Sequence, residues 1–170
     1  MAQYRQHSYQ APEGATQITL VRHGESRAAS EENPFPLVDG HGDPELHANG
    51  EQQAEMVGER LKGENIDAIY ITSLQRTRQT AAPLCRHLGL TAIVEADLRE
   101  VFLGDWEGGV MRIRAAASDP IFTQMQEQQR WDLIPGAENW ETLNTRVMAG
   151  LARIHKAHPN QTVVAVVHGG

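Results

Sequence analysis

The sequence predicts an α/β fold, specifically a three-layer α/β/α sandwich around a mostly parallel sheet. Short apolar segments typical of buried strands alternate along the chain with longer segments whose apolar residues recur at helical spacing. Strands that alternate with helices in this way pair in parallel, because each helix crosses back over the sheet before the next strand begins. No change in composition marks an internal boundary. We therefore expect one domain over residues 17–170, preceded by a loose polar arm at 1–16.

Each expected element has its own sequence signal. Strands are indicated by short runs of β-branched and other apolar residues at 17–22, 68–72, 92–94 and 163–167. Helices are indicated by apolar residues at helical spacing, in segments at 51–62, 74–88, much of 110–130, and 138–158. Ser73 is the expected N-cap of the second helix, since its hydroxyl can accept a hydrogen bond from the first turn. The stretch 26–50, rich in proline and glycine, is expected to be a long irregular loop.

Composition narrows the classes of protein that the chain can represent. Its 170 residues carry a formal charge of −7, which argues against nucleic acid as a partner but allows a local cationic pocket. No segment is long and apolar enough to span a membrane, and no signal peptide is apparent, so the expected location is the cytoplasm. The single cysteine, Cys85, occupies an apolar position of an expected helix and is read as a core residue.

Polar side chains follow the end of each predicted strand. Because the carboxyl ends of parallel strands share one edge of a sheet, these groups should converge on one crevice. The candidates in chain order are Arg22, His23, Ser73, Arg76, Arg78, Glu95, Asp97, Arg99, Glu100 and His168.

Two arginines and two histidines around one point suit a phosphoryl group. Arginine presents planar donors that match phosphate oxygens, and a neutral imidazole can attack phosphorus. A nearby carboxyl group could protonate the leaving alkoxide, and Glu100 is the leading candidate over Glu95 and Asp97. No metal or other cofactor is required for this chemistry. The alternating polar residues between Asp39 and His47 are typical of any polar loop rather than of a metal site.

Five segments of the chain resemble, in order, the signature motifs of the histidine phosphatase (phosphoglycerate mutase-like) superfamily. They read LVRHGES at 20–26, ELHANGEQQA at 45–54, YITSLQRTRQTA at 70–81, LREVFLGDWEG at 98–108, and PGAE at 135–138 followed by VHG at 167–169. The resemblance implies that His23 is the phosphorylated nucleophile, that Glu100 is the proton donor, and that Arg22 and His168 assist catalysis. The predicted contacts to the phosphoryl group are Arg22, Arg76, His168, Gly24, Ser26 and Gly169.

The chain departs from the family pattern at several positions. His47 and Leu74 stand where the family usually has threonine and proline. More important, Ala29 stands six residues after the nucleophile, where the family often has an asparagine that contacts phosphate. The replacement donor is expected from Ser26 or from the long loop. The family also continues past its HG turn with a helix and a strand, and we expect this domain to lack them.

These observations predict a phosphomonoester hydrolase that acts on a small phosphorylated substrate through a phosphohistidine. The GDWEG stretch after Glu100 resembles the phosphatase branch more than the glycolytic mutases. Two alternatives stay open: phosphoryl transfer of the phosphoglycerate mutase type, and a catalytically weak member that only binds a phosphorylated ligand. The sequence leaves the oligomeric state undetermined.

Overall fold

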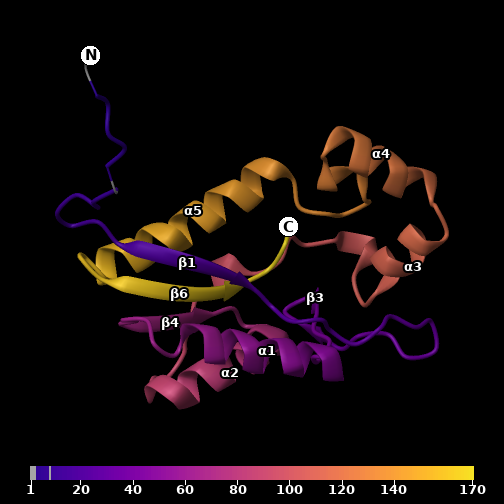
Figure 1. Ribbon diagram of the computed structural model, residues 1–170. Helices are drawn as coiled ribbons and strands as arrows, with labels where there is room; N and C mark the ends of the chain where they lie inside the picture. The colour runs from indigo at the N-terminus through magenta and orange to yellow at the C-terminus, as the bar shows by residue number, and fades with distance from the viewer. Residues whose placement is uncertain (1–2, 8) are drawn as a thin grey trace.

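A single parallel sheet forms the centre of the computed structural model, which describes residues 3–7 and 9–170 (Figure 1). Its four strands pair in the order β1-β6-β4-β5. They are β1 (Gln17–Arg22), β4 (Ala68–Ile71), β5 (Ile93–Val94) and β6 (Thr162–Val167). All four predicted strands are confirmed to within one residue at either end.

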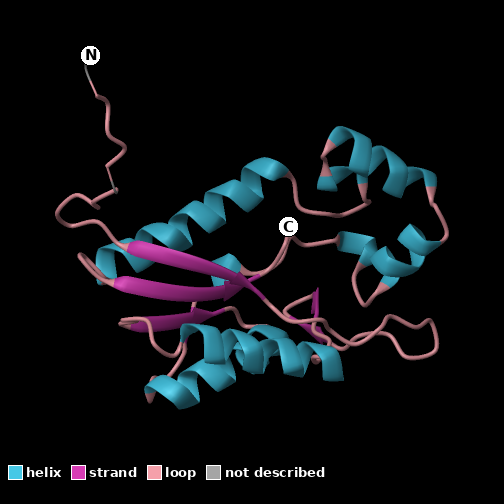
Figure 2. Ribbon diagram, viewed as in Figure 1, coloured by secondary structure: helices cyan, strands magenta, loops and turns pink. Residues whose placement is uncertain are grey.

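Helices cover both faces of this sheet, which confirms the three-layer α/β/α class (Figure 2). On one face lie α1 (Ala48–Leu61) and α2 (Gln75–Leu88), which pack against each other, and on the other lies α5 (Trp140–Ala157). The burial of β6 follows the two-residue period of a strand. Val163 and Ala165 join the core beneath α5, whereas Val164 and Val166 join the core above α2.

The segment between the loop that carries Glu100 (residues 98–108, hereafter the acid-bearing loop) and α5 forms a small separate lobe. Here the single helix expected over much of 110–130 is wrong, because the structure has α3 (Val110–Ala116) and α4 (Pro120–Gln128). Ser118 between them has a φ of 54°, in the left-handed region, which ends the first helix. Asp119 then caps the second, since its Oδ1 accepts from the Ile121 N–H at 2.8 Å, and Pro120 takes the first helical position.

The long loop 26–50 contains a short hairpin that was not expected. Strands β2 (Leu37–Val38) and β3 (His41–Gly42) pair antiparallel around Asp39 and Gly40. Both turn residues have positive φ, at 49° and 82°, as the tight two-residue turn of a hairpin requires. The hairpin carries His41 and Gly42 toward the carboxyl edge of the sheet.

The predicted cap of α2 at Ser73 is also wrong. The N-cap is Leu74, and the Ser73 hydroxyl is buried with no hydrogen-bond partner among residues 3–7 and 9–170. The long loop supplies the missing acceptor instead, because Asp43 Oδ1 accepts from the Gln75 N–H at 2.7 Å. A contact between residues this distant in sequence leaves no local signal, so only the fold reveals it.

The described part of the arm before β1 has neither helix nor strand. The last residues of the arm contact the domain. The Gly14 N–H donates to Asn160 Oδ1 at 2.6 Å, and the Thr16 hydroxyl donates to the His158 carbonyl at 2.7 Å. Across residues 3–7 and 9–170, no helix combines the length and the apolar character needed to cross a membrane.

Candidate active site

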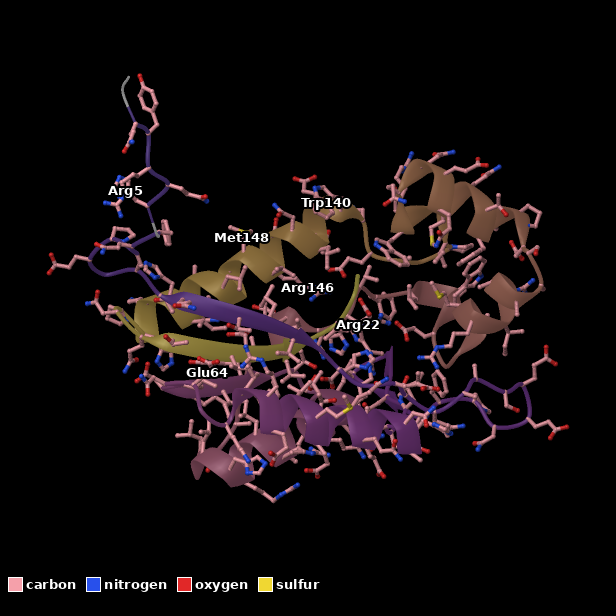
Figure 3. The ribbon with its side chains drawn as sticks, in the orientation of Figure 1. Arg5, Arg22, Glu64, Trp140, Arg146 and Met148 are labelled. Atoms are coloured by element: carbon pink, nitrogen blue, oxygen red, sulfur yellow. The ribbon has the colours of Figure 1, made fainter. Side chains whose placement is uncertain are left out.

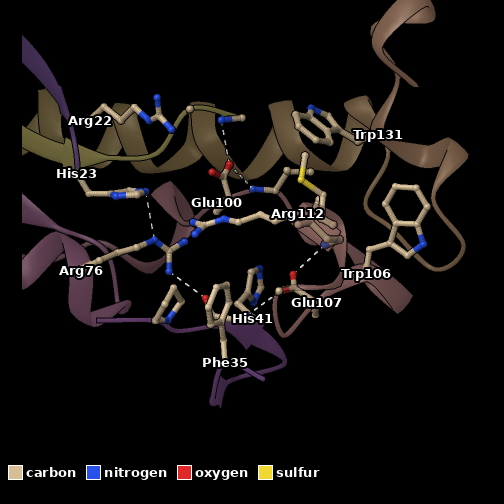
Figure 4. A pocket seen from close by; sticks show the side chains of 18 residues that line it. Arg22, His23, Phe35, His41, Arg76, Glu100, Trp106, Glu107, Arg112 and Trp131 are labelled. Carbon is tan, nitrogen blue, oxygen red and sulfur yellow. Dashed lines mark hydrogen bonds between the residues drawn. The ribbon is translucent and has the colours of Figure 1, made fainter. Parts of the chain in front are cut away.

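A pocket of about 310 Å³ opens at the carboxyl edge of the sheet, where the sequence predicted one. Its floor holds His23, Arg22 and Arg76, and its wall includes Glu100 (Figure 4). The side chains of Arg22 and Arg146 also extend over this edge of the sheet in the whole-molecule view (Figure 3). The other sides are closed by residues of the long loop with its hairpin, of the loop after Glu100, and of the α3–α4 lobe: Phe35, His41, Leu103, Trp106, Met111, Arg112 and Trp131.

His23 is held with one ring nitrogen turned toward the pocket. It follows β1, and its Nδ1 lies 2.7 Å from the Gly24 carbonyl, so Nδ1 carries the hydrogen and Nε2 keeps a lone pair. Burial, with the nearby charges of Arg76 and Arg22, lowers the pKa of His23 to about 4. The imidazole is therefore neutral at pH 7, as a nucleophile must be.

Arg76 joins His23 to the hairpin. It lies in the first turn of α2, where its Nε donates to His23 Nε2 at 3.2 Å and its Nη1 donates to the Gly42 carbonyl at 2.9 Å. The side chain is 7% exposed and Asp43, with an oxygen 4.0 Å away, offers a partial counter-charge. Burial lowers the pKa of Arg76, although guanidinium stays protonated throughout the physiological range.

His168 lies beside His23, since β1 and β6 are adjacent parallel strands. The two imidazole rings meet edge to face with centroids 5.2 Å apart. His168 Nε2 lies 3.0 Å from the Thr72 hydroxyl, while its Nδ1 is buried and has no hydrogen-bond partner among the residues that the structure describes. Burial and then the charge of Arg76 lower its pKa to about 2, so this ring is neutral as well. An unpartnered buried nitrogen next to a cationic pocket is expected where a ligand completes the hydrogen bond.

Glu100 lines the same pocket as His23 and comes from the loop that follows β5. One carboxylate oxygen accepts from the N–H groups of Val101, at 3.0 Å, and Gly170, at 2.9 Å. The loop itself is fixed by Arg146 of α5, which donates to the carbonyls of Asp97, Arg99 and Glu100 within 2.9 Å. The carboxyl group is thereby oriented without being paired to a guanidinium.

Two residues predicted to contact the phosphoryl group are occupied elsewhere. The Gly24 N–H donates to the Thr80 hydroxyl at 3.0 Å, and a Cβ at Gly24 would lie only 2.5 Å from the Gly50 carbonyl oxygen. Close backbone packing against the start of α1 therefore explains this glycine. Ser26 is 5% exposed, and its hydroxyl accepts a hydrogen bond from Arg112 at 2.7 Å. Gly169, in contrast, lines the pocket next to Arg22.

The remaining sequence candidates lie away from the pocket lining. Arg78 is exposed, Glu95 and Asp97 form ion pairs with Arg153 of α5, and Arg99 donates to Asp39 at 2.9 Å. These pairs support the loop that carries Glu100 rather than the pocket itself.

Arg112 is a cationic pocket residue that was not among the sequence candidates. It comes from α3, about ninety positions after His23, and no motif singled it out. Glu107 also lines the pocket, but its two carboxylate oxygens accept from the N–H groups of Gly42, at 2.6 Å, and Leu103, at 2.9 Å. It joins the hairpin to the acid-bearing loop.

Comparison with known proteins decides the family. The sequence model of the histidine phosphatase superfamily (branch 1) matches residues 18–170, nearly the whole chain. The chain belongs to the histidine phosphatase superfamily. The resemblance seen in the sequence motifs is thus confirmed.

Among the relatives within the histidine phosphatase superfamily, some are named as mutases and others as phosphatases. The chain is 36% identical over 158 residues to phosphoglycerate mutase-like protein 4 of Arabidopsis thaliana, covering 91% of this chain and 66% of that protein. It is 32% identical over 151 residues to phosphoserine phosphatase 1 of Hydrogenobacter thermophilus, covering 89% and 70%. The chain thus spans about two thirds of the length of these relatives, and slightly less than that for the first.

Solved structures give the same fold. A putative alpha-ribazole-5'-P phosphatase of Escherichia coli superposes with a TM-score of 0.70 at 25% identity, over 91% of this chain and 74% of the other. A mycobacterial glucosyl-3-phosphoglycerate phosphatase gives 0.70 at 26% identity, over 88% and 72%.

Proposed function

We propose that the protein is a phosphomonoester hydrolase, which transfers the phosphoryl group of a small phosphorylated substrate to His23 and then to water. One observation carries this proposal above the others. A neutral imidazole, with its Nδ1 hydrogen fixed on the Gly24 carbonyl, directs Nε2 into a pocket that contains arginines and a carboxyl group.

In the first half of the reaction, His23 Nε2 forms a bond to phosphorus as the ester P–O bond breaks. Arg22 and Arg76 neutralise the charge on the phosphoryl oxygens. Arg76 exchanges its hydrogen bond on Nε2 for one to the substrate. The Glu100 carboxyl group donates its proton to the departing alkoxide, which leaves as an alcohol.

In the second half, Glu100 acts in the opposite sense. Its carboxylate removes a proton from water, and the oxygen of that water attacks phosphorus as the P–N bond breaks. Inorganic phosphate leaves, and both His23 and Glu100 return to their starting protonation states.

His168 completes the binding of the phosphoryl group in this proposal. When the Thr72 hydroxyl donates to Nε2, the other nitrogen, Nδ1, carries the hydrogen and can donate to a phosphoryl oxygen. This tautomer gives the buried Nδ1 the partner that it lacks in the free protein. Gly24 and Ser26 serve as supports of the site, because their polar groups are already paired.

Mutase chemistry is the second candidate, favoured by the mutase-named relative. The two activities differ in whether an alcohol or water receives the phosphoryl group. We expect the wild-type chain to release phosphate from an aryl phosphate without a metal, and to interconvert 3-phosphoglycerate and 2-phosphoglycerate at a negligible rate. Fast isomerisation with little release of phosphate would refute the proposal that the protein is a hydrolase. Binding of phosphate without either reaction would favour the third alternative, a ligand-binding member.

A further inference from the structure

Arg112 brings a third guanidinium group to the pocket, and the mechanism above assigns it no role. Its side chain extends from α3 toward the side of the pocket that holds Arg76 and His23 (Figure 4). The mutual effects of the charges agree with this placement, since Arg112 helps to lower the pKa of both His23 and Arg76. Three like charges directed at one cavity repel one another, so a dianion is the ligand that they suit.

The hydrogen bonds of Arg112 fix its direction but do not use all of its donors. Nη1 donates to the Arg27 carbonyl at 2.8 Å and Nη2 to the Ser26 hydroxyl at 2.7 Å. The ring of Phe35 supports the guanidinium, whose central carbon lies 5.2 Å from the ring centroid. A guanidinium has five N–H groups, so three have no acceptor among the described residues. Such a pre-positioned donor costs little ordering when a ligand arrives.

The start of α3, the helix that carries Arg112, packs on Ala29, whose side chain has no polar group. The N-cap of α3, Gly109, lies directly against it, because a Cβ at Gly109 would lie 3.0 Å from the Ala29 Cβ. Arg112 follows one helical turn later. The helix that covers the small residue at position 29 therefore also places a cation at the pocket.

We propose that Arg112 is a phosphoryl-binding residue, which supplies from α3 the donors that a side chain at position 29 does not. This inference rests on the proposed function only for the identity of the ligand, a phosphate monoester. Binding of inorganic phosphate alone tests it.

The test compares Arg112→Met with Arg114→Met in the full chain. Arg114 lies on the same helix but is outside the pocket and pairs with Asp119 at 3.2 Å. Titration calorimetry with inorganic phosphate should show roughly 10- to 100-fold weaker binding for Arg112→Met, because a charge-assisted contact is lost, and no change for Arg114→Met. Arg112→Lys should recover part of the loss. Equal affinity of Arg112→Met and wild type would overturn the inference.

A crystal structure of the wild type with orthovanadate separates a direct contact from an effect on loop structure. We expect an Arg112 nitrogen within hydrogen-bond distance of a vanadate oxygen. If vanadate binds and Arg112 contacts only Ser26 and Arg27, the residue is structural and the inference is wrong. A wild type that binds phosphate through Arg112 but hydrolyses no ester would refute the proposed function and leave this inference standing.

Discussion

At the scale of single residues, the surroundings of the two histidines, His23 and His168, give the two identical side chains different hydrogen-bonding properties. Both are neutral at pH 7 because burial lowers their pKa values. His23 presents a lone pair to the pocket because its Nδ1 lies against a carbonyl. His168 has its Nε2 on a hydroxyl, which leaves the opposite nitrogen for a ligand. Hydrogen-bond partners rather than charge therefore distinguish the two rings, and they are the basis for the different roles that we propose for them.

Glu100→Gln tests the acid at this scale. An amide cannot protonate the leaving alkoxide, so we expect kcat/KM for alkyl phosphates to fall roughly 100- to 10,000-fold. A nitrophenyl phosphate should lose much less kcat/KM, since its leaving group needs no proton. The measurement is kcat/KM with both substrates, because this ratio reports the steps up to phosphorylation of His23 and leaves out the later hydrolysis, in which Glu100 acts as a base. Asp105→Asn, an exposed change in the same loop, is the control and should leave both rates unchanged. Equal losses on both substrates would contradict the assigned role.

The site residues that could be predicted from sequence follow strands, whereas Arg112, which was not predicted, lies on a helix. Arg22, His23 and His168 lie next to strand ends, so the topology alone brings them together. Arg112 reaches the pocket from a lobe whose position depends on tertiary packing, and a basic residue on a short helix gives no distinguishing pattern. The role of Gly24 was also hidden, because the requirement comes from the backbone of Gly50, which is distant in sequence.

At the scale of elements, α5 secures the loop that carries the proposed acid. Arg146 forms hydrogen bonds to three carbonyls of that loop. It also forms an ion pair with Glu138, with an N–O distance of 2.7 Å, and the Glu138 side chain is only 7% exposed. Burial raises the pKa of Glu138, but hydrogen bonds from Arg146 and the Phe102 N–H outweigh it and leave the pKa below its usual value. The pair is thus a structural clamp at the edge of the active site.

Replacement of Arg146 by Met should destabilise the protein by about 3 kcal/mol, because it leaves a buried carboxylate and three carbonyls without their donor. Arg153→Met is the matched control on the same helix. Arg153 bonds to Glu95 and Asp97 of the same loop, but its side chain is 54% exposed, so its loss should cost less than about 1 kcal/mol. Urea unfolding monitored by circular dichroism measures both. Similar losses for the two variants would show that the clamp is not special.

Helices and strands could be predicted from sequence where their signals are local. The strands are correct because each is a run of apolar residues. The prediction of one helix over 110–130 was wrong, although Asp119 and Pro120 are an ordinary signal for the start of a second helix. The hairpin was also not predicted, although Asp39–Gly40 is an ordinary signal for its turn. The cap of α2 could not be predicted, since its acceptor on Asp43 comes from a distant loop.

At the scale of the whole molecule, the two buried histidines couple stability to pH. Their folded pKa values, about 4 and about 2, lie below the ordinary value of 6.5. Between pH 6.5 and 4 the unfolded chain binds protons on these rings that the folded chain does not. The free energy of unfolding therefore falls as pH falls through this range.

Each ring should contribute about 1 kcal/mol of this loss between pH 7 and pH 5.5. We expect His168→Asn to remove that share, so that its stability changes less between the two pH values than that of the wild type. His7→Asn, in the exposed arm, should keep the full dependence. Urea unfolding in phosphate-free buffers at both pH values gives the comparison. An identical pH dependence in His168→Asn and wild type would show that the ring is not held neutral by the fold.

Trapping of the covalent intermediate asks whether the phosphoryl group is transferred to His23. The full chain is mixed with a ³²P-labelled phosphate monoester, quenched rapidly in base, and separated from free substrate. We expect label on the wild-type protein that is stable in base and labile in acid, as a phosphoramidate is, and that is absent from His23→Ala. Label that persists in His23→Ala, or turnover by the wild type with no label at any quench time, would contradict a phosphohistidine at this position.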